Sequence, residues 1–293
     1  MIRLLKRNEL NEEKYNDCIA NSLQSRVYAY SWYLDIVADN WHVLVLNDYK
    51  AVMPLPIRKK MGITYVYPPF WLIELGVFSQ EKDLSIDAFI EEVTKKYYFI
   101  ETRLNTKNTL EHVGSNFQLK ELQYLFINTE YKETLNQYQK DKKKGLKKAK
   151  ATNLIEVWND EPKKMIELFK ENIGKRTPNI NGIDYAKLLS LISTCIQKDI
   201  GEILSIYNEE KLLVASGFFL KHSKRVTLLV SSTDLANRNN GANTFLIDRA
   251  IHKYSNQFKT FHFGGSSIAS IAKYFKGFGA KTETYFLLKK RLL

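Results

Sequence analysis

The feature that most constrains the fold is an order of sequence patterns that recurs in the two halves of the chain. When Asn47 is aligned with Asn208, the segments VLVLNDYKAVMPLPI and ILSIYNEEKLLVASGFF fall together. Each reads as a strand, an Asn-led turn and a second strand, which is typical of a β-hairpin. At the same offset IDAFIEEVTKKY aligns with IDRAIHKYSNQF, and both place apolar residues at helical spacing. A recurring order of this kind indicates two similar units in tandem.

Each half therefore reads as helix, hairpin, strand, helix, strand, helix-like segment and closing strand. Few residues are identical between the halves, so the interpretation depends on the order of the elements rather than on identity. The sequence predicts an α/β (α+β) fold of two tandem domains, each a mixed twisted sheet flanked by helices. We place the boundary at residue 130, which gives domains 1–130 and 131–293.

The charge composition bears on the partners. Lys and Arg number 44 against 32 Asp and Glu, a net charge of +12. Such an excess favours polyanions such as RNA, phosphate-rich cofactors or an anionic membrane face, but it also fits a basic protein without such partners. The start MIRLLKRNEL lacks the apolar core of a signal peptide, and no run reaches the about 18 apolar residues of a spanning helix. We therefore expect a cytoplasmic protein without a transmembrane segment.

Cysteines, histidines and acids supply no clear catalytic cluster. Cys18 and Cys195 fit neither a disulfide framework nor a zinc site, and the histidines lack metal-ligand spacing, so we expect no metal and no permanently bound cofactor. Glu74 and Glu101 lie in apolar or strand-like surroundings. They are either paired structural acids or buried bases.

The segment that joins the halves is strongly basic. YQKDKKKGLKKAKATNLIEV carries seven lysines between positions 140 and 150. Leu146 and Ala149 lie three residues apart and could contact the protein while the lysines point outward. Two interpretations remain, a solvated basic face and an arm that contacts the phosphates of RNA or of a nucleotide-linked substrate. The candidate residues are Lys142, Lys143, Lys144, Lys147 and Lys148.

A strand that leads into a helix forms a second candidate site. RVTLLVSSTD reads as a strand, and the helix after it begins near Asn243 or Thr244. The loop between them contains Arg238, Gly241 and Ala242. A helix N-terminus offers unpaired amides and the positive end of the helix dipole to a pyrophosphate, and Gly241 permits close approach of the backbone. The alternative is an ordinary turn with an N-cap residue.

The stretch FHFGGSSIASIAKYFKGFGAKTETYF, residues 261–286, is the most patterned in the chain. It reads as a strand, a Gly-Ser turn in which Ser266 or Ser267 caps a helix, the helix itself and a closing strand. The turn matches neither a P-loop nor a nucleophile elbow. His262 has no evident acid partner, which argues against a serine hydrolase.

The basic segment and the C-terminal stretch together resemble the FemAB-type transferases and the related BioF2-like acetyltransferases. The resemblance is carried by the lysines up to Ala149, by the turn Phe263–Ser266 and by the run Phe275–Gly279. Members are built from two GNAT (GCN5-related N-acetyltransferase) domains in tandem. The resemblance implies an N-acyltransferase that moves an acyl or aminoacyl group from acyl-CoA or aminoacyl-tRNA to an amine on a small-molecule or peptide acceptor. It also implies tRNA as a possible partner.

The resemblance further implies roles for particular residues. The donor site is expected in the second domain, because the counterpart of residues 261–286 in the first half lacks the glycine pair and has Ser115 at the position of Lys276. Lys276 matches a lysine that lies near the transferred carbonyl in Fem proteins, Tyr274 is the candidate acid, and Phe275 is expected to contact substrate. The donor phosphates are expected at Arg238, Gly241, Ala242 and Asn243, which match the GNAT signature at Arg238 and Gly241 but have Asn at its last position. The alternative function is a non-catalytic basic module that binds RNA or another polyanion.

Overall fold

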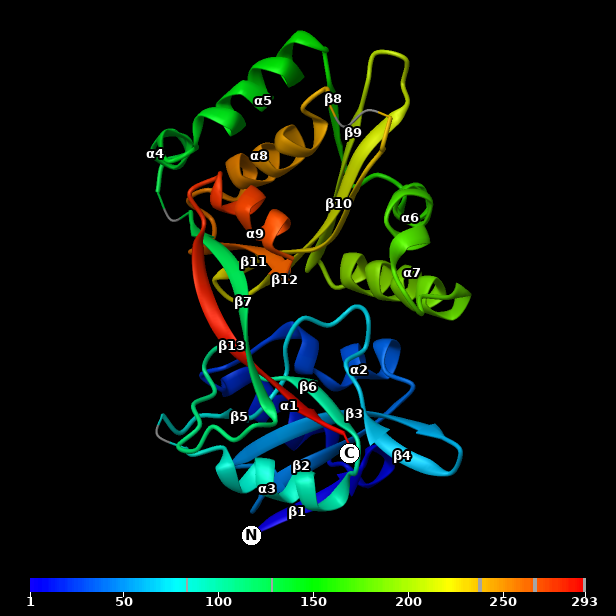
Figure 1. Ribbon diagram of the computed structural model, residues 1–293, viewed down its shortest axis with the longest axis vertical. Helices are drawn as coiled ribbons and strands as arrows, with labels where there is room; N and C mark the ends of the chain where they lie inside the picture. Colours follow the sequence, from blue (N-terminus) through cyan, green and yellow to red (C-terminus); the bar gives the residue numbers. More distant parts are fainter. Residues whose placement is uncertain (83, 128, 237–238, 266–267, 292–293) are drawn as a thin grey trace. The chain divides into compact units, whose positions relative to one another are not determined.

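The computed structural model describes residues 1–293 except 83, 128, 237–238, 266–267 and 292–293. The chain divides into two units (Figure 1). Unit 1 comprises Met1–Lys120 with Thr284–Leu293, and unit 2 comprises Glu121–Glu283. Each unit contains a mixed β-sheet with helices packed on it, which confirms the predicted fold class. None of the helices in the described part of the chain is long and apolar enough to cross a bilayer.

The sheet of unit 1 is built on the predicted N-terminal hairpin. Its strands are β1 (Ile2–Lys6), β2 (Asn40–Leu46), β3 (Ala51–Lys60), β4 (Ile63–Val66), β5 (Phe78–Ser79) and β6 (Ile100–Arg103), and its helices are α1 (Glu12–Asn21), α2 (Ser31–Val37) and α3 (Asp87–Lys96). β2 and β3 pair antiparallel from Asn40↔Ile57 to Leu46↔Ala51. The apolar face of α3, with Phe89 and Val93, packs into a core with Met53 and Leu55 of β3.

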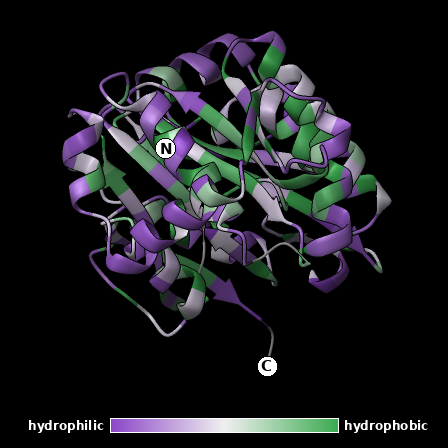
Figure 2. Cartoon of the chain, turned by 90° about the horizontal axis from the view of Figure 1, so that it is seen from above, coloured by the Kyte–Doolittle hydropathy of each residue, from purple (hydrophilic) through white to green (hydrophobic). Residues whose placement is uncertain are grey.

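Unit 2 has the same order of hairpin, strand, helix and strand, with further helices. Its helices are α4 (Tyr131–Asn136), α5 (Lys140–Ala151), α6 (Pro162–Asn172), α7 (Gly182–Gln197), α8 (Ala242–Tyr254) and α9 (Ala269–Lys276). Its strands are β8 (Ile155–Trp158), β9 (Gly201–Tyr207), β10 (Leu213–His222), β11 (Arg225–Thr233) and β12 (Thr260–Gly265). Figure 1 shows α8 on one face of this sheet and α6 and α7 on the other. Hydrophobic residues follow the strands in Figure 2, and the core of unit 2 joins Phe219, Leu246 and Phe261.

The closing strands are exchanged between the two halves of the sequence. β7 (Phe117–Phe126) begins in unit 1, but its residues from Leu122 to Phe126 pair with β12 of unit 2. β13 (Lys281–Lys290) begins in unit 2, and its end pairs with β6 of unit 1, from Leu287↔Arg103 to Lys290↔Ile100. The division between the units therefore falls inside β7 and β13, whereas the sequence pattern predicts one boundary at residue 130.

The predicted order of elements occurs in both halves with one exception. The second half has α9 before its closing strand, but residues 105–116 of the first half contain no helix. The prediction of a helix-like segment there is wrong. Asn105 Nδ2 donates to the carbonyl of Leu75, and Asn108 Nδ2 donates to that of Val77. Asn105 Oδ1 also accepts a hydrogen bond of 3.0 Å from the Lys107 amide, and a local side-chain-to-backbone bond of this kind competes with helix formation.

Candidate functional site

A cavity of about 440 Å³ opens in unit 2 where three elements meet. β11 contributes Ser231, Ser232 and Thr233 from its C-terminal end, and α8 and α9 contribute the other walls. β11 and β12 are parallel, but they pair only from Arg225↔Thr260 to Thr227↔His262. The cavity therefore lies beyond the paired part of two parallel strands, which is where ligands usually bind in α/β sheets.

The N-terminal end of α8 forms part of the wall of this cavity. Gly241 is the N-cap residue and has a left-handed φ of 86°. Asn240 Oδ1 accepts a hydrogen bond of 2.8 Å from the Ala242 amide. Among the residues that the structure describes, the amides of Asn243 and Thr244 donate to no acceptor. Two free amides at the positive end of the helix dipole form a favourable position for an anionic group.

The predicted donor-binding residues thus separate into three groups. Gly241 and Asn243 line the cavity. Ala242 is fully buried in the core of unit 2, and only its backbone is at the helix start. Arg238 lies outside the described residues.

Tyr274 of α9 forms part of the cavity wall opposite this helix end. Its hydroxyl lies 3.1 Å from Thr244 Oγ1. Lys142 Nζ lies over its ring, 3.6 Å from the centroid. Burial raises the pKa of the phenol far above its usual value. Tyr274 is therefore protonated at neutral pH and can donate a hydrogen bond.

The neighbours of Tyr274 on α9 face different directions. Phe275 lines the cavity and stacks on Phe263, with ring centroids 4.8 Å apart. Lys276 does not line the cavity, and its Nζ lies 3.8 Å from Glu121 Oε2 with about half of each side chain exposed. Successive helical residues are about 100° apart, so Lys276 cannot face the same way as Tyr274. Tyr274 and Phe275 thus both line the cavity, whereas Lys276 does not.

The predicted basic segment is helix α5, and four of its five candidate lysines are exposed. These are Lys143, Lys144, Lys147 and Lys148. Lys142 is only 4% exposed. Its ammonium group bonds Asp141 at 2.9 Å and lies over the rings of Tyr274 and Phe278. The prediction that all of these lysines point outward is therefore wrong for Lys142, because two aromatic rings cover it.

Helix α5 packs closely against the turn that precedes α8. A Cβ atom on Gly241 would lie 2.3 Å from the carbonyl oxygen of Gly145, and one on Gly145 would lie 3.0 Å from Thr244 Oγ1. Thr152 Oγ1 also donates to the carbonyl of Asn240 at 3.4 Å. Because only glycine allows these approaches, the lysine-bearing helix and the N-terminus of α8 are direct neighbours.

Several residues of the cavity were missed by sequence reasoning. They are Ile173, Ser231, Ser232, Thr233, Thr244, Ser270 and Ile271. The polar run SST at the end of an apolar strand was a signal for three of them. Ser232 Oγ donates to the carbonyl of Leu168 at 3.1 Å, which ties this strand end to α6.

Other candidate residues belong to structural pairs. His262 is fully buried, and its Nε2 lies 3.4 Å from Glu283 Oε1, so the expectation that it has no acid partner nearby is wrong. The turn serines Ser266 and Ser267 lie outside the described residues. Glu74 pairs with Arg26 at 2.5 Å and Glu101 with Lys289 at 2.9 Å, in agreement with the structural interpretation of both acids. The described part of the chain has no group of three or more His, Cys, Asp or Glu side chains that could hold a metal.

The fold was compared with known proteins. No protein-family model matches the chain, and no curated protein matches it in sequence. Among solved structures, FemX is similar with a TM-score of 0.65 and 9% identity over 97% of this chain and 96% of FemX. A tandem GNAT protein from the clavulanic acid biosynthesis pathway has a TM-score of 0.56 and 7% identity over 98% of this chain and 97% of that protein.

L-PGS from Bacillus licheniformis is also similar, with a TM-score of 0.55 and 9% identity over 96% of this chain and 91% of that one. Identities this low demonstrate a shared fold and nothing finer. The similarity nevertheless extends over nearly the whole chain in all three cases. The chain therefore shares the fold of FemX, L-PGS and the tandem GNAT protein, in agreement with the fold that the resemblance of its basic and C-terminal segments implied.

Proposed function

We propose that this chain is an N-acyltransferase that moves an acyl or aminoacyl group from acyl-CoA or aminoacyl-tRNA to an amine of a small-molecule or peptide acceptor. The observation that carries the proposal is the cavity of unit 2. A helix end with free amides and a protonated phenol line that one cavity. Both proposed donors carry phosphate groups and an acyl carbonyl. The helix N-terminus can bind a phosphate, and the phenol can donate a hydrogen bond to the carbonyl.

In the proposed reaction the neutral amine attacks the donor carbonyl carbon. A C–N bond forms, and the bond from that carbon to the thiol sulfur or tRNA hydroxyl oxygen breaks. The nitrogen releases one proton and the leaving group takes one up, so the step is balanced. Tyr274 is the proposed donor of the latter proton, because it is the residue with an acidic side-chain proton that lines the cavity among the residues described. No side-chain nucleophile is needed, since positioning supplies much of the rate.

The phenol is tested by Tyr274→Phe, which keeps the ring under Lys142 and removes only the hydroxyl. We expect the transfer rate to fall by about 10²- to 10⁴-fold, the usual contribution of general acid catalysis. Lys273→Met is the matched control, because Lys273 is exposed on the same helix and does not line the cavity. A Tyr274→Phe rate equal to the wild-type rate would remove the phenol from the mechanism.

Lys276→Met tests the role that the family resemblance implies for this lysine. If Lys276 acts near the transferred carbonyl, the variant should transfer much more slowly than the wild type while keeping its fold. Wild-type rates would instead agree with its place beside Glu121, away from the cavity. The fold is checked by circular dichroism.

The donor is tested by thermal unfolding with acetyl-CoA and with charged tRNA. A ligand at about 100 times its Kd stabilises the folded state by about 2.7 kcal/mol, so the true donor should raise Tm clearly. A response to acetyl-CoA supports an acyl-CoA donor, and a salt-sensitive response to charged tRNA alone supports the aminoacyl route. No response to either donor contradicts both assignments.

The second candidate is a basic module that binds RNA or another polyanion without catalysis. It is favoured by the four exposed lysines of α5, which adjoins the N-terminus of α8. The test is Lys143→Gln combined with Lys144→Gln, Lys147→Gln and Lys148→Gln. If this variant no longer binds tRNA and the wild type transfers no acyl or aminoacyl group, the protein is a binding module and not a transferase.

A further inference from the structure

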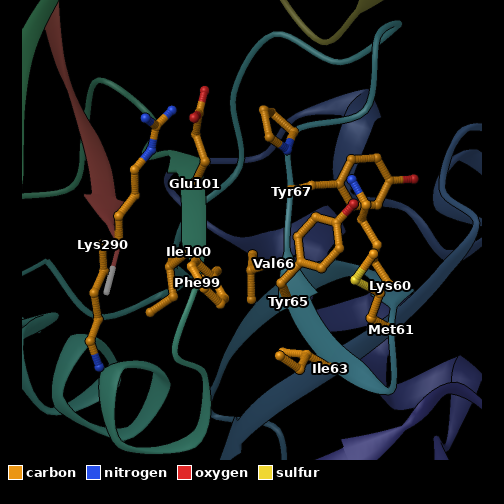
Figure 3. Close-up of a pocket in the computed structure, with 12 residues that line it drawn as sticks. Lys60, Met61, Ile63, Tyr65, Val66, Tyr67, Phe99, Ile100, Glu101 and Lys290 are labelled. Atoms are coloured by element: carbon orange, nitrogen blue, oxygen red, sulfur yellow. The ribbon is translucent and has the colours of Figure 1, made fainter. Parts of the chain in front are cut away.

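Unit 1 contains a cavity of its own, of about 520 Å³, which the proposed transfer reaction does not use. It lies beside β4 and the beginning of β6, and the end of β13 closes it (Figure 3). All of its lining residues belong to unit 1. Its volume lies in the range of small-molecule sites.

The cavity exists because two parallel strands of unit 1 pair over a very short length. β4 pairs with β3 from Ile63 to Val66, but it meets β6 only at Val66↔Ile100. The preceding residues of β4 have no strand on their second edge among the residues described. In unit 2 the corresponding strands β11 and β12 pair over three positions at their starts. β6 begins beside the last residue of β4, so no strand in the described part of the chain fills the space beside the earlier residues of β4. In unit 2, β12 fills the corresponding space beside β11.

The walls of the cavity are apolar and partly open to solvent. Val66 and Ile100 are buried, whereas Ile63 is 46% exposed. Figure 3 shows Tyr65 on one side of Val66 and Phe99 with Ile100 on the other. Large exposed apolar side chains gathered around a cavity indicate a binding surface, because a soluble protein otherwise keeps such groups apart.

The charged groups around the cavity do not cancel. Glu101 is neutralised by Lys289 at 2.9 Å. Lys290 Nζ is occupied by the carbonyls of Thr94 and Tyr97 at the end of α3. Lys60 and Arg291 line the cavity but have no acidic partner in the described part of the chain. The carbonyl partners of Lys290 leave its charge in place, so Lys60, Lys290 and Arg291 are three cationic groups around an apolar cavity.

We propose that this cavity binds a small ligand with an apolar body and a carboxylate group. The body, aryl or alkyl, packs on Tyr65, Phe99 and Ile100, and the carboxylate pairs with Lys60 or Arg291. Burial of the apolar body provides the main favourable free energy, at about 25 cal/mol per Å². The cationic rim provides selectivity for an anion over its neutral analogue.

The test is titration calorimetry of the full chain, without any donor, with 3-phenylpropionate and octanoate. The matched neutral probes are 3-phenylpropionamide and octanamide. We expect at least one carboxylate to bind in the millimolar range or tighter and its amide to bind more weakly. Whichever carboxylate binds more tightly identifies an aryl or an alkyl body, and either result supports the proposal.

Variants locate the binding in unit 1. The variant that removes the cation paired with the carboxylate, Lys60→Glu or Arg291→Glu, should weaken carboxylate binding by about fivefold, the scale of one exposed ion pair. Tyr65→Ala should weaken binding of carboxylate and amide alike. Lys59→Glu is the control, because Lys59 is exposed on the same strand but does not line the cavity, and it should leave the Kd unchanged.

The proposal is overturned if neither carboxylate binds, or if Lys60→Glu and Arg291→Glu bind as the wild type does. It is also overturned if Ile271→Trp, which fills the unit 2 cavity, abolishes binding while Tyr65→Ala does not. Circular dichroism establishes that each variant is folded. These results are independent of the transfer assay, because no donor is present in the titration.

Discussion

Lys142 carries a positive charge into the interior of unit 2, with its side chain only 5% exposed. The Tyr274 ring lies 3.6 Å from its ammonium nitrogen, and Asp141 supplies one ion pair. Gly277 leaves room for the lysine stem, because a Cβ atom there would lie 2.5 Å from Lys142 Cε. A cation over an aromatic face stabilises more strongly when both groups are removed from water. Lys142 therefore holds α5 against the helix that carries Tyr274.

Replacement of this residue tests that role. Lys142→Met keeps the apolar stem and removes the charge, so we expect the free energy of unfolding to fall by about 2 kcal/mol, the scale of a desolvated cation–π contact. Lys143→Met, on the same helix but exposed, should change it by less than about 0.5 kcal/mol. The measurement is urea unfolding of both variants. Equal losses in the two variants would show that the contact of Lys142 with the Tyr274 ring does not raise the free energy of unfolding.

At the scale of the elements, the contact between α5 and α8 depends on backbone approach rather than on side chains. Gly145 and Gly241 meet where the lysine-bearing helix passes the start of α8. This contact sets the distance between the exposed lysines and the free amides at the cavity. A larger residue at either position would move α5, which bears the exposed lysines, away from the helix end at the proposed donor site.

Gly241→Ala should destabilise the protein for two reasons that a control can separate. Alanine at a φ of +86° costs about 1–2 kcal/mol. Its Cβ would also overlap the Gly145 carbonyl oxygen, and overpacking adds about 1–3 kcal/mol. Gly62→Ala has a similar φ of +81° with nothing within 4 Å, so it should show only the first cost. Denaturant unfolding that gives the same loss for both variants would contradict the close packing of α5 on α8.

At the scale of the whole molecule, the exchange of closing strands makes each half of the sequence incomplete. Leu125 and Ile127 belong to the hydrophobic core of unit 2, although they precede the boundary expected from the sequence. Leu288 belongs to the core of unit 1 although it is almost the last residue described. Each unit therefore includes part of a strand from the other half of the sequence, β7 in unit 2 and β13 in unit 1.

Fragments test this arrangement. Residues 121–283 contain the second half of β7 and all the strands that pair with it in unit 2, so this fragment should fold alone. Residues 131–293 lack that edge of the sheet and leave Phe261 and its neighbours uncovered, so we expect a poorly folded or aggregating product. Two-dimensional NMR spectra distinguish a dispersed, folded fragment from a collapsed one. A well-folded 131–293 fragment together with an unfolded 121–283 fragment would refute the exchange.

The parts of the fold that were predictable depend on local patterns. The two hairpins, the strand RVTLLVSSTD and the helices after it were recognised from apolar periodicity and turn residues, which act over a few neighbouring positions. The segment 105–116 was mispredicted as helix-like, because its asparagines bind the backbone of residues about 30 positions earlier. No local pattern contains that information.

The sequence by itself determined the order of elements in the two halves, except for residues 105–116, and the helix start that carries Gly241 and Asn243. It did so because strand ends and helix starts depend on neighbouring residues. Tyr274 and Phe275 were named from the family resemblance, and their place at the cavity wall came from the structure. Only the tertiary structure decided that β7 and β13 exchange partners, that Lys142 is buried and that Lys276 points away from the cavity. The pairing partner of a strand depends on contacts between segments that are distant in the chain. The burial of one helix face depends on such contacts too, and a local sequence pattern does not specify them.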